Sequence, residues 1–163
     1  MIKKCLPPAL ALWLILAGTA ACVNVNTTKE RQPQDEQAIR SSIEKMNVAL
    51  AQRDLAGFMA LFDDSDNIML IGSDVGEIYR GRQEVAGFIK MLYGMPFVFS
   101  FELTQVVITP DKNSAWAFVD GAMVHTGASG KVKKIPYRFA ITLVKREGGW
   151  RWQLFHGSIP RGE

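Results

Sequence analysis

A histidine and an arginine lie on neighbouring strands predicted near the end of the chain. Residues 137–160 carry β-branched and aromatic side chains on both sides of Gly148-Gly149, a pattern typical of a β-hairpin. Because side chains alternate between the two faces of a strand, one set from the return strand is expected to share a face. The set is Trp150, Trp152, Leu154, His156 and Ser158. Two polar groups would therefore follow a line of apolar side chains.

His156 is the first candidate for a catalytic residue, since an imidazole can act as an acid, a base or a hydrogen-bond donor near neutral pH. Arg138, on the partner strand, could bind a carboxylate or an enolate oxygen. Each residue also has a structural alternative. His156 can bond a backbone carbonyl or Ser158 and close the core, and Arg138 can form a salt bridge to Glu77 or Asp120.

The remaining candidates are ligand-binding residues. An indole such as that of Trp116 can stack on a ring-shaped ligand, although large aromatic residues at strand spacing more often belong to a core. Ser158 lacks the strand-to-helix turn of a nucleophilic serine, so no hydrolytic triad is predicted. The candidate ligand-binding set is Trp116, Asp120, Tyr137, Ser158 and Glu77.

Metal-ligating residue types occur singly. His125, His156, Asp120 and Glu102 show none of the short spacings that define a zinc site. We therefore assign no metal and no cofactor.

The composition indicates one globular domain that does not bind nucleic acid. The chain has 163 residues, of which 48% are hydrophobic and 21% charged. Its formal charge of +3 includes Lys3 and Lys4 of a predicted export signal, which leaves 17 Lys and Arg against 16 Asp and Glu, or +1. Such a balance argues against an electrostatic nucleic-acid binder.

The first 21 residues are typical of a bacterial signal peptide. Two lysines precede an apolar run at residues 6–16, and the small residues 17–21 suit a signal peptidase. Cys22 follows at once, and Thr19-Ala20-Ala21-Cys22 resembles a lipobox in which Thr replaces the usual Leu. We expect Cys22 to be the lipid-modified first residue of the mature protein, and its lipid anchor to be the only contact with the membrane. The alternative is cleavage by signal peptidase to a soluble periplasmic protein. Residues 22–34 are polar and predict a flexible tether.

Periodicity beyond the tether predicts three helices followed by a long meander of strands. Apolar residues at helical spacing indicate helices from Asp35, over 55–62 and from Gly81 or Arg82 to about Gly94. Strands are expected at 68–71, briefly before Gly81, and at 97–109, 114–126, 137–145 and from 150, with Gly121 marking a bulge or bend. This order predicts an α+β fold in which a curved antiparallel sheet wraps over the helices and leaves a conical pocket.

Several strings, in this order, resemble the SnoaL-like domain of the nuclear transport factor 2-like superfamily. They are AQRDL at 51–55, IGSDVGEIYRG at 71–81, GWRW at 149–152 and HGS at 156–158, and the resemblance covers residues 35–160. It implies a cone-shaped α+β barrel, commonly a homodimer packed through the open face of the sheet. SnoaL-like sequences often place an arginine at the position of Arg138.

The resemblance leaves two functions open, because the superfamily contains both enzymes and binding domains. Its ketosteroid isomerases use a tyrosine as an oxyanion donor, and the first predicted helix here contains no tyrosine. The incomplete set of acid and base groups favours an exported protein that binds a small, partly apolar ligand in its cone or acts as a dimeric interaction module. The alternative is a cofactor-free isomerase, cyclase or dehydratase that uses His156 and Arg138.

Replacing Cys22 by Ser tests the lipid anchor. We expect the variant to move from the membrane fraction to the soluble fraction, because the thiol that would carry the acyl chains is absent. Membrane fractionation followed by immunodetection measures the change. Unchanged membrane association would contradict the anchor.

Overall fold

The computed structural model describes residues 33–161. The predicted signal sequence at residues 1–21, Cys22 and nearly all of the tether lie outside the described residues. Within residues 33–161, no helix is both long enough and apolar enough to cross a membrane.

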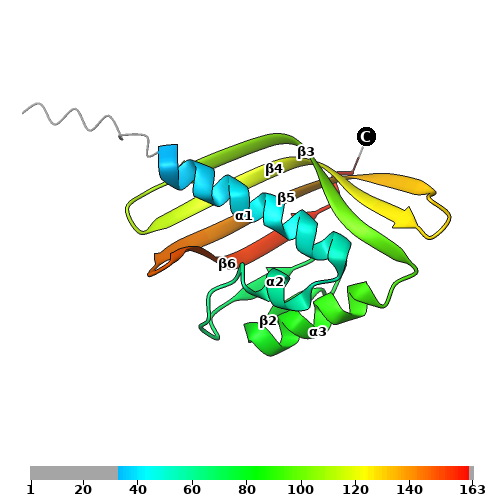
Figure 1. Ribbon diagram of the computed structural model, residues 1–163, viewed down its shortest axis with the longest axis horizontal. Coiled ribbons are helices and arrows are strands. Elements are labelled where there is room, and N and C mark those ends of the chain that lie inside the picture. The colour runs from blue at the N-terminus through cyan, green and yellow to red at the C-terminus, as the bar shows by residue number, and fades with distance from the viewer. Residues whose placement is uncertain (1–32, 162–163) are drawn as a thin grey trace, which may run out of the picture. The chain divides into compact units, whose positions relative to one another are not determined.

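Three helices and six strands make up the described part of the chain (Figure 1). The helices are α1 (Pro33–Gln52), α2 (Leu55–Met59) and α3 (Gly81–Tyr93). The strands are β1 (Met69–Ile71), β2 (Ile78–Arg80), β3 (Phe97–Pro110), β4 (Ser114–Gly127), β5 (Val132–Arg146) and β6 (Gly149–Ser158). The predicted elements are all present, although α2 ends earlier than expected. Its predicted cap is confirmed, since the Gly57 N–H donates to Asp54 Oδ1 at 2.9 Å.

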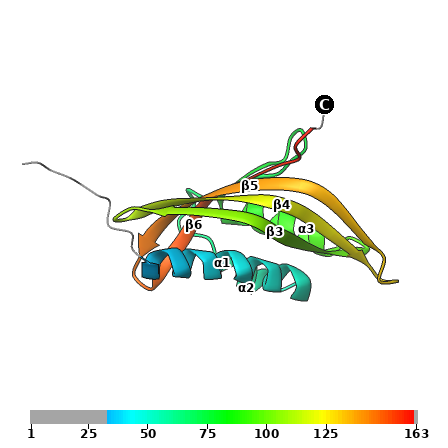
Figure 2. The same ribbon diagram turned by 90° about the horizontal axis from the view of Figure 1, so that it is seen from above.

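The strands form one curved sheet in the order β2-β1-β6-β5-β4-β3. Every neighbouring pair is antiparallel except β1 and β6, which run parallel. Figure 2 shows β4 and β5 bending toward the side on which α1 and α2 lie. The predicted α+β architecture is therefore confirmed, with a sheet that stays open and does not close into a barrel.

Two irregularities in register shape this sheet. β3 shifts by one residue between Leu103 and Gln105, opposite Gly121 of β4. A Cβ on Gly121 would lie 1.9 Å from the Glu102 carbonyl oxygen, so only glycine fits beneath the bulged strand. The expectation that Gly121 marks a bulge is confirmed.

The second irregularity corrects the predicted faces of the last strand. β5 and β6 shift register between Thr142 and Leu143, because Leu143 pairs with Trp152 whereas Thr142 pairs with Leu154. The extra residue of β6, Gln153, reverses the alternation that follows it. Trp150 and Trp152 are buried, whereas His156 and Ser158 are exposed on the opposite face. The prediction that all these residues share one face was wrong.

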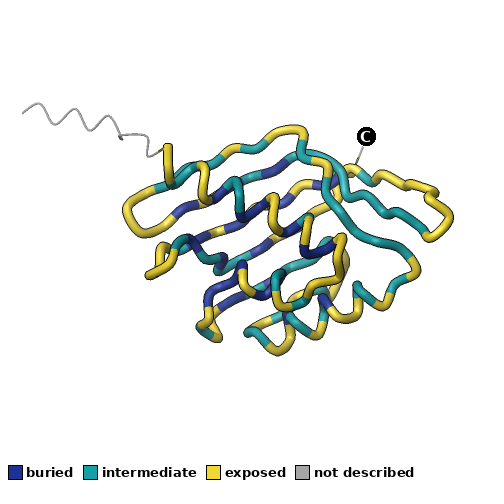
Figure 3. The backbone as a smooth tube through the Cα atoms, in the orientation of Figure 1, coloured by how far each residue is buried: buried dark blue, intermediate teal, exposed yellow. Residues whose placement is uncertain are grey.

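The core fills the space between the helices and the inner face of the sheet. Figure 3 shows that buried residues are concentrated in α1 and in the central strands. Tyr137, Phe139, Ile141 and Leu143 of β5 all point inward. The C-terminal half of α1 is fixed to β3 by Asn47, whose side-chain amide donates to the Phe101 carbonyl and accepts from its N–H, both at 2.7 Å.

Candidate functional site

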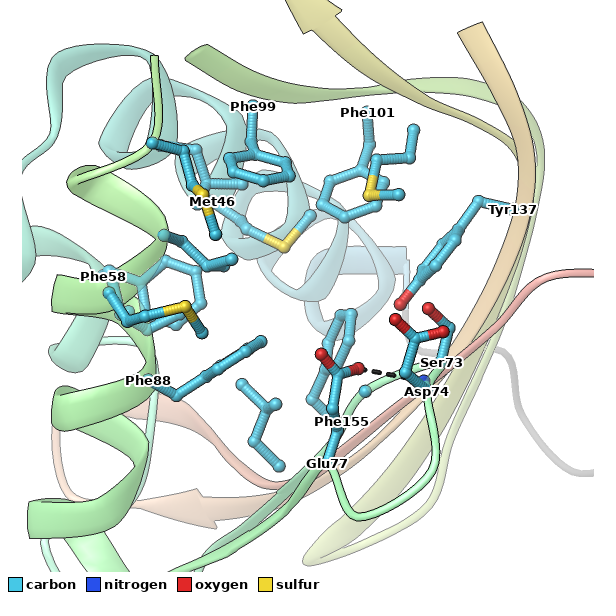
Figure 4. A pocket seen from close by; sticks show the side chains of 18 of the residues that line it. Met46, Phe58, Ser73, Asp74, Glu77, Phe88, Phe99, Phe101, Tyr137 and Phe155 are labelled. Atoms are coloured by element: carbon cyan, nitrogen blue, oxygen red, sulfur yellow. Dashed lines mark hydrogen bonds between the residues drawn. The ribbon is translucent and has the colours of Figure 1, made fainter. Parts of the chain in front are cut away.

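A cavity of about 320 Å³ lies between the helices and the curved inner face of the sheet. Figure 4 shows its side chains converging from α3 on one side and from the sheet on the other. Most of the lining is apolar. Apart from His125 of β4, the polar groups lie on β5 and in the turn between β1 and β2. The lining residues are Met46, Leu50, Phe58, Leu70, Gly72, Ser73, Asp74, Glu77, Phe88, Ile89, Met91, Leu92, Met95, Phe99, Phe101, Met123, His125, Tyr137 and Phe155.

The apolar walls consist largely of phenylalanine and methionine. Phe88 of α3 stacks on Tyr79 of β2 with ring centroids 4.3 Å apart, which fixes one wall. Phe101 of β3 contacts the ring of Tyr137 at 5.4 Å. Aromatic pairs of this kind hold the rings in place, so the cavity is preformed.

The polar end is formed by Tyr137 of β5 and by the turn between β1 and β2. Ser73 and Asp74 lie beside the Tyr137 hydroxyl (Figure 4). Glu77, in the same turn, accepts a hydrogen bond from the Asp74 N–H at 3.0 Å through Oε2. This bond holds its carboxylate on the cavity side of the turn.

Two glycines make room for these polar side chains. A Cβ on Gly157 would lie 1.8 Å from the Tyr137 hydroxyl, and one on Gly72 would lie 2.0 Å from Glu77 Oε2. The Tyr137 hydroxyl therefore lies against Gly157 of β6, where any side chain would occupy its space. The same close approach lets the Glu77 carboxylate fold back over its own turn.

The Tyr137 hydroxyl is a neutral phenol under physiological conditions. Burial raises the pKa of Tyr137 to about 12, since the phenolate would lose its hydration, and the nearby carboxylates of Glu77 and Asp74 act in the same direction. The hydrogen bond with Ser73 acts against this rise. A phenol can both donate and accept a hydrogen bond, so Tyr137 can orient the polar group of a ligand.

His125 contributes a second polar group, distant in sequence from the β1–β2 turn. Its ring stacks on Phe97 with centroids 4.4 Å apart, and its Nε2 atom is buried without a hydrogen-bond partner. Burial lowers the pKa of His125, and the Lys133 ammonium lowers it further by repulsion. The imidazole is therefore neutral at pH 7.

The structure separates the residues predicted from the sequence into two groups. Tyr137 and Glu77 line the cavity. The other five project from the outer face of the sheet, where β4, β5 and β6 carry them side by side. They are His156, Arg138, Trp116, Asp120 and Ser158.

On the outer face, Arg138 forms one of the salt bridges considered from the sequence. Its Nε atom donates to Asp120 Oδ1 at 2.8 Å, and the pair faces directly across β4 and β5. Both side chains are about half exposed, so solvent screens the pair and its contribution to stability is small. Arg138 and His156 do not line the cavity, because strand alternation directs them away from it.

Sequence reasoning missed Ser73, Asp74 and His125 as site residues. Ser73 and Asp74 belong to a glycine-flanked turn whose position over Tyr137 depends on the parallel pairing of β1 with β6. His125 follows Met123 at strand spacing, and this alternation could have placed it on the inner face. Within residues 33–161, no group of three or more His, Cys, Asp and Glu side chains is arranged to hold a metal ion.

Comparison with known proteins identifies the family. The family model described as "SnoaL-like domain" matches residues 39–162, about three quarters of the chain. No curated protein matches the sequence.

Solved structures share the fold at low sequence identity. A candidate dehydratase of the nuclear transport factor 2-like family from Streptomyces avermitilis has a TM-score of 0.72 at 14% identity, covering 80% of this chain and 99% of that one. A nuclear transport factor 2-like superfamily protein from Salmonella enterica has a TM-score of 0.71 at 21% identity, covering 81% and 95%. A candidate aromatic ring hydroxylase from Novosphingobium aromaticivorans has a TM-score of 0.71 at 15% identity, covering 82% and 94%.

The lowered pKa of His125 predicts a pH dependence of stability. As the pH falls below about 6.5, the unfolded chain gains a proton at His125 before the folded chain does, so the free energy of unfolding decreases until the pH passes the folded-state pKa. His125→Phe keeps the ring that stacks on Phe97 and removes the titration. Urea unfolding at about pH 7.5 and about pH 5.5 should show a smaller loss of stability in the variant than in the wild type. An equal loss of stability in the wild type and the variant would show that His125 does not cause the pH dependence.

Proposed function

Because the chain belongs to the SnoaL-like domain family, we propose that it binds a small, largely apolar molecule with one polar group in the cavity beneath the sheet. One observation carries the proposal: apart from His125, the polar side chains of this mostly apolar cavity lie together at Tyr137 and the β1–β2 turn. Ligand sites typically combine apolar walls with a few convergent polar groups in this way.

The size of the cavity supports a small ligand. At about 320 Å³ it lies at the lower end of the range of about 300–1,000 Å³ that is usual for ligand pockets. Phe99 and Phe101 can contact a flat or branched hydrocarbon body, while the Tyr137 hydroxyl and Ser73 hydrogen-bond its polar group. The ligand would thus be oriented with its polar group toward the β1–β2 turn.

Binding is a better account of the cavity than the isomerase, cyclase or dehydratase considered from the sequence. In that hypothesis His156 is the general acid or base, and Arg138 stabilises an oxyanion of the substrate. Both side chains are on the outer face, and the guanidinium is already paired with Asp120. A ligand in the cavity would meet neither of them, so the proposed binding does not depend on them.

We also propose that the protein acts in the cell envelope as a homodimer. Support for export comes from the signal-like residues 1–21 and from Cys22, which would be lipid-anchored or lie at the start of a soluble periplasmic form. Support for a dimer comes from the outer face of the sheet, where Trp116 is 47% exposed and Val107 is 37% exposed. Burying such side chains against a second copy would remove apolar surface from water.

Filling the cavity should abolish binding of an apolar probe. The neutral fluorescent probe N-phenyl-1-naphthylamine is expected to brighten when it binds the wild type, and Met123→Trp should weaken this binding by at least about tenfold by occupying the site. Val124→Trp is the matched control, because Val124 is adjacent on β4 and points to the opposite face. Fluorescence titration measures both affinities. Equal binding by both variants would place the probe elsewhere.

The dimer proposal predicts a change in mass with one outer-face substitution. Wild-type protein should sediment as a dimer at micromolar concentration, and Trp116→Arg should shift it toward the monomer by placing a charge in the apolar contact. Val48→Arg, on an exposed site of α1, serves as the control. Sedimentation equilibrium measures the masses, and a monomeric wild type would rule the proposal out.

A further inference from the structure

We infer that the cavity selects ligands whose polar group is a protonated amine over ligands of the same shape that carry a carboxylate. This inference rests on the proposed function and specifies the chemical class of its ligand. It follows from the carboxylates that line the polar end of the cavity, from the lack of lysine and arginine among the described lining residues, and from the ring of Tyr137 nearby.

The polar end carries two carboxylates. Glu77 is half-buried, and its side chain folds over Gly72 toward the cavity. Its Oε2 atom accepts the Asp74 N–H at 3.0 Å, which holds the carboxylate in position. Asp74 lies in the same turn with its side chain beside the Tyr137 hydroxyl, although it is more exposed to solvent. A cation at this end would meet both groups at short range.

Cations do not balance these carboxylates within the cavity. Among the described residues, neither lysine nor arginine contributes to the lining. The cation that acts on a lining residue is Lys133, which is exposed and faces His125 rather than the β1–β2 turn. A ligand carboxylate at the polar end would therefore face like charges and lose its hydration without a cationic partner.

The remaining contacts also suit an amine. The Tyr137 hydroxyl and the Glu77 carboxylate accept hydrogen bonds, and an ammonium group supplies only donors. The ring of Tyr137 lies beside the polar end, and aromatic rings attract cations. Met46 and Met91 also line the cavity, and methionine side chains adapt to irregular hydrocarbon shapes.

A ligand series with one skeleton tests the inference. The probes are 3-phenylpropylamine, 3-phenylpropan-1-ol and 3-phenylpropanoate, which share an apolar body and differ in the polar group. Isothermal titration calorimetry at neutral pH should give an affinity for the amine at least about tenfold higher than for the carboxylate, with the alcohol between them.

Isosteric variants identify the groups responsible. Glu77→Gln should bring the affinities for amine and carboxylate to within a few-fold of each other, while the affinity for the alcohol stays unchanged. Asp74→Asn should do the same to a smaller extent, because solvent screens the more exposed carboxylate. Glu102→Gln is the matched control, since Glu102 is exposed and paired with Lys134 on the outer face.

The outcomes separate this inference from the proposed function. Alcohol binding with equal or tighter carboxylate binding would overturn the amine preference and leave the proposed function standing. An amine preference that survives in both Glu77→Gln and Asp74→Asn would also overturn it, because the charge would then come from elsewhere. If none of the three probes binds the wild type and N-phenyl-1-naphthylamine also fails to bind, both conclusions fall.

Discussion

The buried indole of Trp152 is the contact on which the rest of the structure depends. Its Nε1–H donates to Ser42 Oγ of α1 at 2.9 Å, and Ser42 in turn donates to the Ile39 carbonyl at 2.7 Å. The backbone of Trp152 also pairs with the segment after α2, donating to the Leu61 carbonyl and accepting from the Asp63 N–H. One residue of β6 thus joins both N-terminal helices to the sheet. The cavity lies away from this contact, between the C-terminal end of α1, α3 and the sheet.

Curvature is the part of the fold that local sequence pattern predicts least well. The helices, the long strands and the bulge at Gly121 followed from periodicity and from one glycine within a strand. The bulge at Gln153 carries no glycine or proline, and its cause is long-range: Trp152 must face α1 while Phe155 must also face the core. Both can point inward only if an extra residue separates them. After Gln153, simple alternation no longer gives the correct face, so the face predicted for His156 was wrong.

Site residues could be predicted where no register shift disturbs the alternation of their strand. Tyr137 keeps the alternation of β5 and faces the core, as hydrophobic pattern alone indicates. Glu77 was predicted both as a ligand-binding residue and as a possible partner for Arg138. It lines the cavity because of the turn that joins two short strands. Ser73 belongs to that turn, and only the parallel pairing of β1 with β6 brings it to Tyr137. Contacts between segments so distant in sequence are set by topology, which no local pattern encodes.

Protonation state connects the architecture to the character of the site. Tyr137 and His125 are both neutral at pH 7, since burial raises the pKa of the phenol further above neutrality and lowers the pKa of the imidazole. The charges at the polar end are therefore those of the β1–β2 turn, where solvent and the Asp74 N–H stabilise them. Arg138 lies on the outer face of the same sheet, away from this cavity, where water solvates it. The cavity therefore has apolar walls and one end that carries two carboxylates, those of Glu77 and Asp74. Strand alternation and the turn between β1 and β2 produce this arrangement.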